Sequence, residues 1–397
     1  MRTFLVALVL SAALAPISRA DTPETRRLFY PGEIWPDDRG VHINAHGGGI
    51  LLHDGTYYWF GEHKVAGKRG NTAQVGVHVY SSKDLYNWKD EGIALAVSDD
   101  PGSDIARGCI LERPKVVFNQ RTGKFVMWFH LELKHNGYKS ARSGVAIADQ
   151  PAGPYRFLRS MRPNAGVWPD NLPADRRKPL SSDDQADLAK YLFTGGPPGR
   201  KFPEDLLCRR DFEGGQMARD MTMFQDDDGK VYHIYSSEEN GTLQISQLDA
   251  DFTAPAGHYA RILVGKFNEA PAMFKAGGRY FLLTSGTTGW APNPCRCFSA
   301  DSIWGPWTYQ GNPCHGTEQQ NKITFDSQST FVLPSSGRAA PFIFMADRWR
   351  PDNAIDGRYI WLPMQMDNGL PVLEWKESWS LDGSNGEGAH ASGPASP

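Results

Sequence analysis

The feature that most constrains the fold of this chain is a phrase that occurs five times, a turn followed by an aromatic-rich strand. The copies begin at Asp54, Thr122, Asp228, Gly277 and Ser336. Asp-Gly and Gly-Gly between apolar runs are typical of β-hairpins. The composition agrees, because 12 Trp, 14 Tyr and 20 Phe with 41 Gly and 28 Pro favour strands and turns over helices.

The spacing of these hairpins predicts the architecture. Successive turns are about 68, 106, 49 and 60 residues apart, and the long interval contains a polar segment at about 163–216. Removing about 40 residues of that segment brings the interval to about 66. Near-equal units, each a small antiparallel sheet, predict an all-β fold, a five-bladed β-propeller with one insertion. Within the insertion, Ser181–Leu192 is predicted to form a capped helix.

The two ends of the chain are expected to lie outside the propeller. Residues 1–20 have a basic start, an apolar run and a small-residue end, which predicts a secretory signal peptide cleaved after Ala20. We therefore expect a secreted or periplasmic protein without a membrane span. The propeller should occupy residues 21–380, and the Gly-, Ser-, Ala- and Pro-rich residues 381–397 are predicted to be disordered.

Charge and cysteine content narrow the choice of partners. Without residues 1–20 the chain has 40 basic and 45 acidic residues, and no basic cluster points to nucleic acid. Five cysteines leave at least one thiol unpaired, and Cys314 is a candidate partner for Cys295 or Cys297. Zinc binding by these three and His315 is disfavoured, because the spacing matches no known zinc finger. The sequence does not indicate an oligomeric state.

Two Glu-x-Pro segments point to the chemistry. Glu269 lies in Asn268–Pro271 between two strand-like runs, and Glu112 stands in the same pattern within Leu111–Val116. A buried carboxylate without a partner is costly, so each should protonate or find a partner. Proline fixes the chain as it enters a strand. The repeated pattern therefore predicts two carboxylates that face one cavity.

In a propeller the first strand of each blade lines the axis, so the residues just before each hairpin are candidates for one axial site. These segments are Asn44–Gly49, Glu112–Pro114, Arg219–Met221, Asn268–Pro271 and Asp326–Ser329. Glu62, which follows the next strand, is expected at the same rim. Converging carboxylates suit glycoside hydrolysis, in which one donates a proton and another assists the attack.

These segments resemble glycoside hydrolase family 43, and within it the exo-β-1,3-galactanase-like and neighbouring galactan-acting subfamilies. The resemblance runs from about Ile43 to Trp379 and leaves out the insertion and the tail. It is carried by Asn44–Ile50, Tyr58–Glu62, Glu112–Val116, Arg219–Asp220, Asn268–Pro271, Gly289–Asn293, Ser327–Gln328, Asp347–Pro351 and Arg358–Trp361.

The resemblance implies an inverting, exo-acting glycosidase. Glu269 would be the general acid, and the charge of Asp220 would hold its carboxyl group protonated. Glu112 and Glu62 would bind sugar hydroxyls. The structural alternatives are an ion pair of Glu269 with a buried arginine and one of Asp220 with Arg219 or another basic group.

The matched motifs also suggest Asn44, His46, Trp290 and Arg348 as substrate contacts, although a hydrogen-bonded core histidine equally explains His46. No cofactor or metal is expected, and a central calcium ion stays an open alternative. Asp226–Gly229 is explained as a solvated hairpin turn, because it lacks the spacing of a calcium-binding loop.

The general base is the point at which this chain departs from the wider family. Most members have an aspartate on the first blade, but Asn44-Ala45-His46 contains no acid. The galactanase-like members share this gap, and the resemblance implies that an amide matching Gln328 orients or activates the water. Glu112 is the alternative, since a carboxylate is a competent base. Asp326 is less favoured.

The sequence thus predicts an exported glycosidase that acts on an oligo- or polysaccharide and releases terminal galactose from β-1,3-galactan or arabinogalactan side chains. One alternative is an α-L-arabinofuranosidase or β-galactofuranosidase of the same family, with the insertion expected to wall the cavity and decide between them. The other is a non-catalytic glycan-binding propeller, which the missing first-blade acid keeps open.

Overall fold

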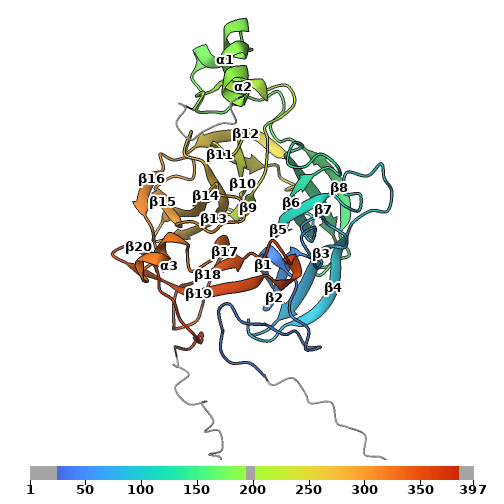
Figure 1. Cartoon of the computed structure of the whole chain (residues 1–397), viewed down its shortest axis with the longest axis vertical. Helices are drawn as coiled ribbons and strands as arrows, with labels where there is room; N and C mark the ends of the chain where they lie inside the picture. The colour runs from blue at the N-terminus through green and yellow to red at the C-terminus, as the bar shows by residue number, and fades with distance from the viewer. Residues whose placement is uncertain (1–24, 194–201, 384–397) are drawn as a thin grey trace, which may run out of the picture.

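The computed structural model describes residues 25–193 and 202–383. Five four-stranded antiparallel sheets stand around a common axis and form a five-bladed β-propeller, as predicted (Figure 1). The proposed signal peptide lies outside the described residues, as does the tail beyond residue 383. No helix in the described ranges is long and apolar enough to cross a membrane.

Each blade is one continuous segment whose strands pair in sequence order. The first blade contains β1 (His46–His53), β2 (Thr56–Glu62), β3 (Gly76–Ser82) and β4 (Lys89–Ala96), and the second contains β5 (Ile110–Asn119), β6 (Lys124–Glu132), β7 (Arg142–Ala148) and β8 (Arg156–Met161). The third contains β9 (Met221–Gln225), β10 (Val231–Ser237), β11 (Thr242–Leu248) and β12 (Pro255–Ile262). The fourth contains β13 (Asn268–Ala276), β14 (Arg279–Gly286), β15 (Arg296–Ala300) and β16 (Thr308–Gly311), and the fifth contains β17 (Gln328–Pro334), β18 (Phe342–Arg348), β19 (Arg358–Asp367) and β20 (Leu370–Leu373).

The five predicted turns all join the first strand of a blade to the second. In the first blade, Asp54 and Gly55 have φ angles of 47° and 65° and connect β1 directly to β2. Two successive residues with positive φ are what a tight hairpin turn requires, which explains the Asp-Gly sequence. The innermost strands therefore all line the axis in the same direction, so the residues at their starts lie at one end of it.

The first and last blades close the ring through an aromatic core rather than by exchanging a strand. The rings of Trp59 and Trp361 are 4.7 Å apart between centroids, and Phe29 stacks on Trp379 at 4.3 Å. Backbone hydrogen bonds of 2.8 and 3.1 Å also join Phe29 and Trp379. These rings are almost fully buried, and each contributes about 1.5–3 kcal/mol of burial free energy or more.

The insertion contains the predicted helix, observed as α1 (Ser182–Phe193), together with α2 (Leu206–Arg210) and the 3-10 helix η1 (Ala174–Arg176). Figure 1 shows α1 and α2 outside the ring, beyond β12. Arg210 of α2 forms an ion pair of 3.0 Å with Glu239 on the β10–β11 turn. Two further short helices, α3 (Glu318–Lys322) and η2 (Ala354–Asp356), lie in the fifth-blade region.

All five cysteines are buried free thiols, so the expected bond from Cys314 to Cys295 or Cys297 is not formed. These three pack into one apolar cluster between the fourth and fifth blades. Burial raises the pKa values of the Cys297 and Cys314 thiols to about 12, which keeps them protonated. They act as small apolar side chains.

Candidate active site

Four of the five innermost strands have a register shift near their start, and in β1, β5 and β13 it takes the same form. The pairing register shifts between His46 and Gly49 in β1, between Glu112 and Lys115 in β5, and between Glu269 and Ala272 in β13. The second residue of each bulge has positive φ, 60° at Gly47, 54° at Arg113 and 54° at Ala270. A bulge leaves backbone groups unpaired and re-aims the neighbouring side chain, and proline tolerates such a position because it has no N–H. The Glu-x-Pro pattern is thus the sequence of a bulge that turns a glutamate toward the axis.

A cavity of about 250 Å³ opens at this end of the axis. Of the predicted site residues, it brings together Glu62, Glu112, Asp220, Glu269, Trp290 and Gln328. Lys64, Asn71, Arg113, Tyr138, Arg219, Asn240, Gly289 and Trp349 complete its lining. Every blade contributes at least one side chain, so the converging arrangement predicted for the first strands is present.

Glu269 is the carboxyl group most strongly shifted toward its neutral form in this cavity. Burial is the main cause and the negative charge of Asp220 the second, and together they raise its pKa to about 8. Arg113 and Arg219 act in the opposite direction. Asn240 Nδ2 donates a hydrogen bond of 2.6 Å to Glu269 Oε1. Glu269 therefore holds a proton at neutral pH and can donate it, which is the property of a general acid.

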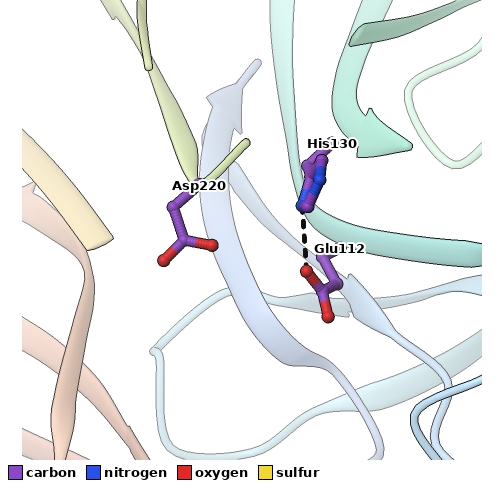
Figure 2. Close-up of side chains that lie close together, drawn as sticks. All are labelled: Glu112, His130 and Asp220. Atoms are coloured by element: carbon purple, nitrogen blue, oxygen red, sulfur yellow. Dashed lines mark hydrogen bonds and ion pairs between the residues drawn. The ribbon is translucent and has the colours of Figure 1, made fainter. Parts of the chain in front are cut away.

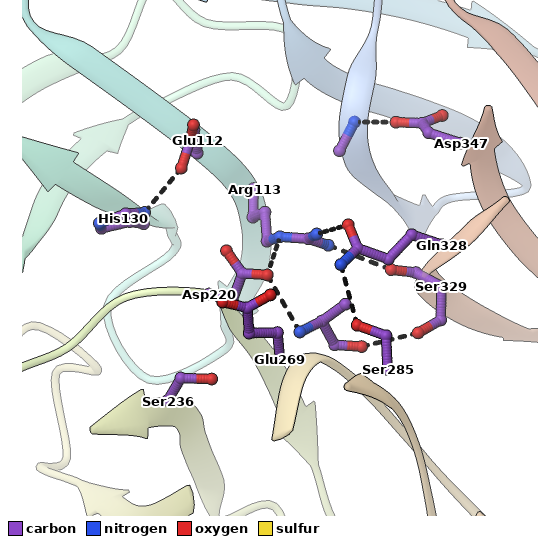
Figure 3. A network of polar contacts seen from close by, with 12 residues as sticks. Glu112, Arg113, His130, Asp220, Ser236, Glu269, Ser285, Gln328, Ser329 and Asp347 are labelled. Carbon is purple, nitrogen blue, oxygen red and sulfur yellow. Dashed lines mark hydrogen bonds and ion pairs between the residues drawn. The ribbon is translucent and has the colours of Figure 1, made fainter. Parts of the chain in front are cut away.

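Asp220 lies beside Glu269 with its carboxylate held from two sides (Figure 3). Arg113 Nε is 3.0 Å from Asp220 Oδ2, and the backbone N–H of Ala270 donates to the same oxygen at 3.0 Å. Asp220 thus forms the ion pair that was considered as its structural role, with Arg113 rather than Arg219 as the partner. That ion pair is compatible with the proposed effect of Asp220 on Glu269. The ion pair fixes the charge that raises the pKa of Glu269.

Gln328 projects into the cavity with a fixed amide. Its Oε1 accepts hydrogen bonds from Arg113 at 2.6 Å and from Trp349 Nε1 at 2.9 Å. Its Nε2 donates to Ser285 Oγ at 2.9 Å. Two donors on one end and an acceptor on the other define which atom is the oxygen. The side chain is thus suited to orienting a small molecule rather than to moving between rotamers.

Glu112 accepts three hydrogen bonds, from His130 Nδ1 at 2.9 Å, Tyr138 Oη at 2.6 Å and Asn71 Nδ2 at 2.8 Å. Figure 2 shows the one from His130. Burial alone would raise the pKa of Glu112, but the hydrogen bond and the charge of His130 outweigh it and hold that pKa far below its ordinary range. A carboxylate this acidic is a weak base. The geometry supports Glu112 as an ionised acceptor for sugar hydroxyls more than as the general base.

Glu112, His130 and Asp220 are also the one group in the described part of the chain with a metal-like arrangement, their ligand atoms lying within 4.8 Å of one another. Both ring nitrogens of His130 are already committed, to Glu112 and to Glu132 at 3.0 Å. Burial opposes protonation of His130, but the two carboxylates raise its pKa to about 9. A charged imidazole cannot ligate a metal, so this group fits a hydrogen-bond network better. The expectation that no cofactor is needed stays a prediction.

Glu62 lines the cavity, but its carboxylate mainly contacts neighbouring protein groups. It forms an ion pair with Lys64 and accepts the backbone N–H of Arg113 at 2.9 Å. Burial raises the pKa of Glu62, and Lys64 partly offsets this. Glu62 thus holds the bulge of β5 from which both Glu112 and the Arg113 side chain reach the cavity.

Three predicted contacts, Asn44, His46 and Arg348, do not line the cavity. The Asn44 side chain exchanges two hydrogen bonds of 2.9 Å with the backbone of Lys64. His46 is fully buried and stacks on Tyr359 at 5.2 Å between centroids. Arg348 donates to the carbonyl oxygens of residues 325 and 326 at 3.0 and 3.1 Å. The interpretation of these residues as direct sugar contacts is corrected to one of supporting the residues around the cavity.

Two residues that sequence reasoning did not single out are central to the site. Arg113 binds both Asp220 and Gln328. The only feature of the sequence that pointed to Arg113 was its place between Glu112 and the following proline. Asn240, the partner of Glu269, ends a run of three residues with φ of 52°, 55° and 62°. The Asn-Gly sequence at this point is a turn signal, but it does not reveal where the Asn240 side chain points.

The insertion does not wall the cavity as expected, because none of its described residues contributes to the lining. It is anchored instead on β12, where Arg261 donates to the backbone carbonyl of Glu204 at 2.6 Å, and on the β10–β11 turn, where Arg210 pairs with Glu239 at 3.0 Å. Glu239 also pairs with Arg219 of the cavity lining at 3.3 Å and directly precedes Asn240, so the described part of the insertion contacts the site indirectly through this turn.

Comparison with known proteins agrees with the fold and the site. The model of the family described as glycosyl hydrolases family 43 matches residues 200–371. A family 43 β-1,3-galactosidase solved with galactodeoxynojirimycin is 50% identical, with a TM-score of 0.81 over 89% of this chain and 100% of that one. An exo-β-1,3-galactanase from Phanerochaete chrysosporium, solved with galactose, is 34% identical, with a TM-score of 0.69 over 89% and 68%.

A third solved structure, an exo-β-1,3-galactanase from Clostridium thermocellum, is 30% identical, with a TM-score of 0.69 over 89% of this chain and 66% of that one. No curated protein matches. The propeller, its axial carboxylates and these matches define a glycosidase that hydrolyses O-glycosyl bonds, so the non-catalytic alternative is not retained. The chain belongs to glycoside hydrolase family 43.

Proposed function

We propose that this enzyme is an exo-acting β-1,3-galactosidase that removes terminal galactose from β-1,3-galactan or arabinogalactan-type side chains with inversion. The observation that carries the proposal is the protonated Glu269 beside the fixed Asp220 carboxylate, in a chain 50% identical to a β-1,3-galactosidase. The small volume of the cavity, about 250 Å³, suits one terminal sugar.

In the proposed reaction, Glu269 gives its proton to the glycosidic oxygen as the bond to the anomeric carbon breaks. The leaving saccharide departs as an alcohol, and the oxygen of a water molecule forms the new bond on the opposite face of the sugar. As this bond forms the water releases one proton to the solvent, and Glu269 regains one proton from the solvent before the next turnover. Asp220 keeps Glu269 protonated before this step. The ionised Glu112 carries a negative charge that stabilises the positive charge developing on the sugar ring.

We assign the orientation of the attacking water to Gln328. Its amide is fixed by Arg113, Trp349 and Ser285 through contacts of 2.6 to 2.9 Å, so it can hold a water without reorganising. Glu112 is less suited to this step because its three donors lower its basicity. Export to the periplasm or medium after cleavage at Ala20 is part of the proposal and rests on residues 1–20.

The function is tested by the sugars that the purified enzyme releases. We expect galactose from β-1,3-galactan, little arabinose from arabinan or arabinogalactan, and an initial product anomer opposite to that of the substrate, observed by proton NMR during the first minutes. Predominant release of arabinose or galactofuranose would assign the enzyme to the alternative specificities. An initial product with retained configuration would overturn the inverting mechanism.

A further inference from the structure

The two carboxyl oxygens of Glu269 have different surroundings. Oε1 accepts the hydrogen bond of 2.6 Å from Asn240 Nδ2. Oε2 has no hydrogen-bond partner among the described residues, and it is not one of their buried polar atoms left without a partner. Since Glu269 lines the catalytic cavity, Oε2 is the oxygen that an arriving glycosidic oxygen can reach.

The amide of Asn240 is held in one orientation by Arg219. Arg219 Nη1 donates a hydrogen bond of 3.2 Å to Asn240 Oδ1. A guanidinium group only donates hydrogen bonds, so the atom that faces it is the amide oxygen. Turning the amide by 180° would bring its NH2 group against the guanidinium, with two donors facing each other. The end of the amide that faces Glu269 is therefore the NH2 group.

The turn that carries Asn240 has a backbone conformation that side chains rarely adopt. Glu238, Glu239 and Asn240 have φ angles of 52°, 55° and 62°. Non-glycine residues with such angles persist only where their surroundings fix them, and they concentrate at functional sites. Ion pairs supply the fixation here, since Glu238 pairs with Arg261 at 2.6 Å and Glu239 with Arg210 of the insertion at 3.0 Å. These pairs fix the turn and, with it, the direction of the Asn240 side chain.

The hydrogen bond from Asn240 determines which oxygen of Glu269 carries the proton. Burial and the charge of Asp220 raise the pKa of Glu269 to about 8, so the carboxyl group is protonated at neutral pH. A proton on Oε1 would point at the N–H of Asn240, and two hydrogens would meet without an acceptor. A proton on Oε2 leaves Oε1 free to accept, which preserves the hydrogen bond.

The effect of Asn240 on the pKa of Glu269 agrees with a role in orientation. The charged groups that act on Glu269 are Asp220, which raises its pKa, and Arg113 and Arg219, which lower it. The hydrogen bond from Asn240 also lowers this pKa, although less than these charges do. A donor that favours the ionised form does not help Glu269 to keep its proton. Its contribution to an acid lies instead in the position of that proton.

We propose that Asn240, oriented by Arg219, is a positioning residue that places the transferable proton of Glu269 on Oε2. The inference rests on the proposed function, in which Glu269 is the general acid, and adds the atom from which the proton leaves. In that step the O–H bond at Oε2 breaks, the proton joins the glycosidic oxygen, and the electron pair stays on Glu269 as a carboxylate. The proton regained from the solvent returns to Oε2, because Asn240 still donates to Oε1.

The first test is a substitution that keeps the shape of the side chain and replaces its donor with an acceptor. In Asn240→Asp the new carboxylate stays ionised, because Arg219 lies within 3.2 Å of the replaced amide. This carboxylate would draw the proton of Glu269 to Oε1, and its charge would raise the pKa of Glu269. The alkaline limb of the kcat/KM–pH profile should move to higher pH by about 1 unit. Below that limb, kcat on β-1,3-galactotriose should fall by about tenfold.

The second substitution removes the amide altogether. Glycine adopts the φ of 62° without strain, so Asn240→Gly preserves the turn. The proton can then occupy either oxygen of Glu269, and we expect kcat on galactotriose to fall by about threefold. A purely structural role would give the opposite order, with Asn240→Gly more impaired than the isosteric Asn240→Asp. On a nitrophenyl β-galactoside, whose leaving group needs little protonation, both losses should be small.

Asn368→Asp is the matched control. Asn368 also precedes a glycine and has a positive φ of 48°, but it is exposed on the β19–β20 turn. The same change of amide to carboxylate should therefore leave the rates and the alkaline limb at their wild-type values.

The outcomes separate this inference from the proposed function. A kcat on galactotriose that is higher in Asn240→Asp than in Asn240→Gly, or an alkaline limb that does not rise in Asn240→Asp, would overturn the positioning role and leave the proposed function intact. No hydrolysis of galactotriose by the wild-type enzyme would overturn the proposed function. The pKa of Glu269 would then be followed in the free protein by 13C NMR of labelled glutamate carboxyl groups, assigned with Glu269→Gln. A higher pKa in Asn240→Asp, absent in Asn368→Asp, would support the inference, and an unchanged pKa would overturn it.

Discussion

Arg113 and Asp220 form an ion pair of 3.0 Å at the centre of the site, although they come from different blades. The same guanidinium donates to Gln328 Oε1 at 2.6 Å, so one side chain fixes both Asp220, beside the proposed acid, and Gln328, the proposed water-orienting residue (Figure 3). Arg113 is almost fully buried, and burying this charge is favourable only because partners surround it. Asp220 and Gln328 are therefore linked through a single side chain.

The first prediction concerns the proton donor. Glu269→Gln removes the proton while keeping the size of the side chain and an acceptor for Asn240. We expect kcat on β-1,3-galactotriose to fall by about 10²-fold or more. A nitrophenyl β-galactoside, whose leaving group needs little protonation, should lose much less, and the ratio of the two losses measures the role of the acid.

The exposed carboxylate of Glu374 provides the matched control, since its side chain is 57% exposed and its one ion pair with a described residue is with Lys376. Glu374→Gln should leave both rates unchanged. Near-normal turnover of galactotriose by Glu269→Gln, or an equal loss on both substrates, would remove Glu269 from the role of general acid.

The second prediction follows from the charge of Asp220. Glu269 must be protonated to act, so kcat/KM of the wild-type enzyme should fall as pH rises through about 8, the pKa of Glu269. Asp220→Asn removes a negative charge that raises this pKa and frees Arg113, which lowers it. The alkaline limb of the kcat/KM–pH profile should therefore move to lower pH by about 1 unit in this variant.

The pH profile distinguishes this electrostatic role from a purely structural one, which would lower the rate at every pH without moving the limb. Asp251→Asn is a suitable control, because Asp251 is 54% exposed and pairs with Arg121 away from the axis. An alkaline limb that stays in place in Asp220→Asn would show that Asp220 does not set the pKa of the acid.

Local sequence patterns were sufficient to predict the fold and the two glutamates at the axis. Turn dipeptides such as Asp54-Gly55 act within a few residues, so their spacing revealed the blades. The Glu-x-Pro pattern likewise encodes a local backbone bulge, which explains why Glu112 and Glu269 both line the cavity.

Side chains whose place depends on a neighbouring blade could not be predicted in this way. His46 occupies the bulge of β1 that corresponds to Glu112 and Glu269, but Tyr359 of the last blade covers it and keeps it fully buried. Asn240 reaches Glu269 only because three residues of its turn adopt positive φ. Such contacts join segments distant in sequence, so no local pattern records them.

The third prediction separates Gln328 from Glu112 in the step in which water attacks. Gln328→Ala removes the acceptor of Arg113 and Trp349, and we expect kcat to fall by about 10²-fold with a small change in KM. Glu112→Gln should raise KM more than it lowers kcat, because the carboxylate is held as an acceptor by three donors. Steady-state kinetics on galactotriose measure both.

The opposite pattern, a large loss of kcat in Glu112→Gln with nearly normal turnover in Gln328→Ala, would assign the role of general base to Glu112. Gln328→Glu adds a further test, since a carboxylate keeps the acceptor for Arg113 but has no N–H for Ser285. Full activity of Gln328→Glu would argue against any role that requires an amide.

The fourth prediction concerns the bulge of β1, where Gly48 lies against the backbone of β2. A Cβ at Gly48 would meet the carbonyl oxygen of Phe60 at 1.8 Å, a contact that only a backbone shift can relieve. Gly48→Ala should therefore lower the free energy of unfolding by about 3 kcal/mol, seen as a lower Tm. Gly214→Ala is the matched control, because a Cβ there meets no atom within 4 Å, and it should change stability by less than about 0.5 kcal/mol. Equal Tm values for the two variants would show that β1 and β2 can separate at the bulge without cost, and that close packing of these strands does not hold the first blade at the axis.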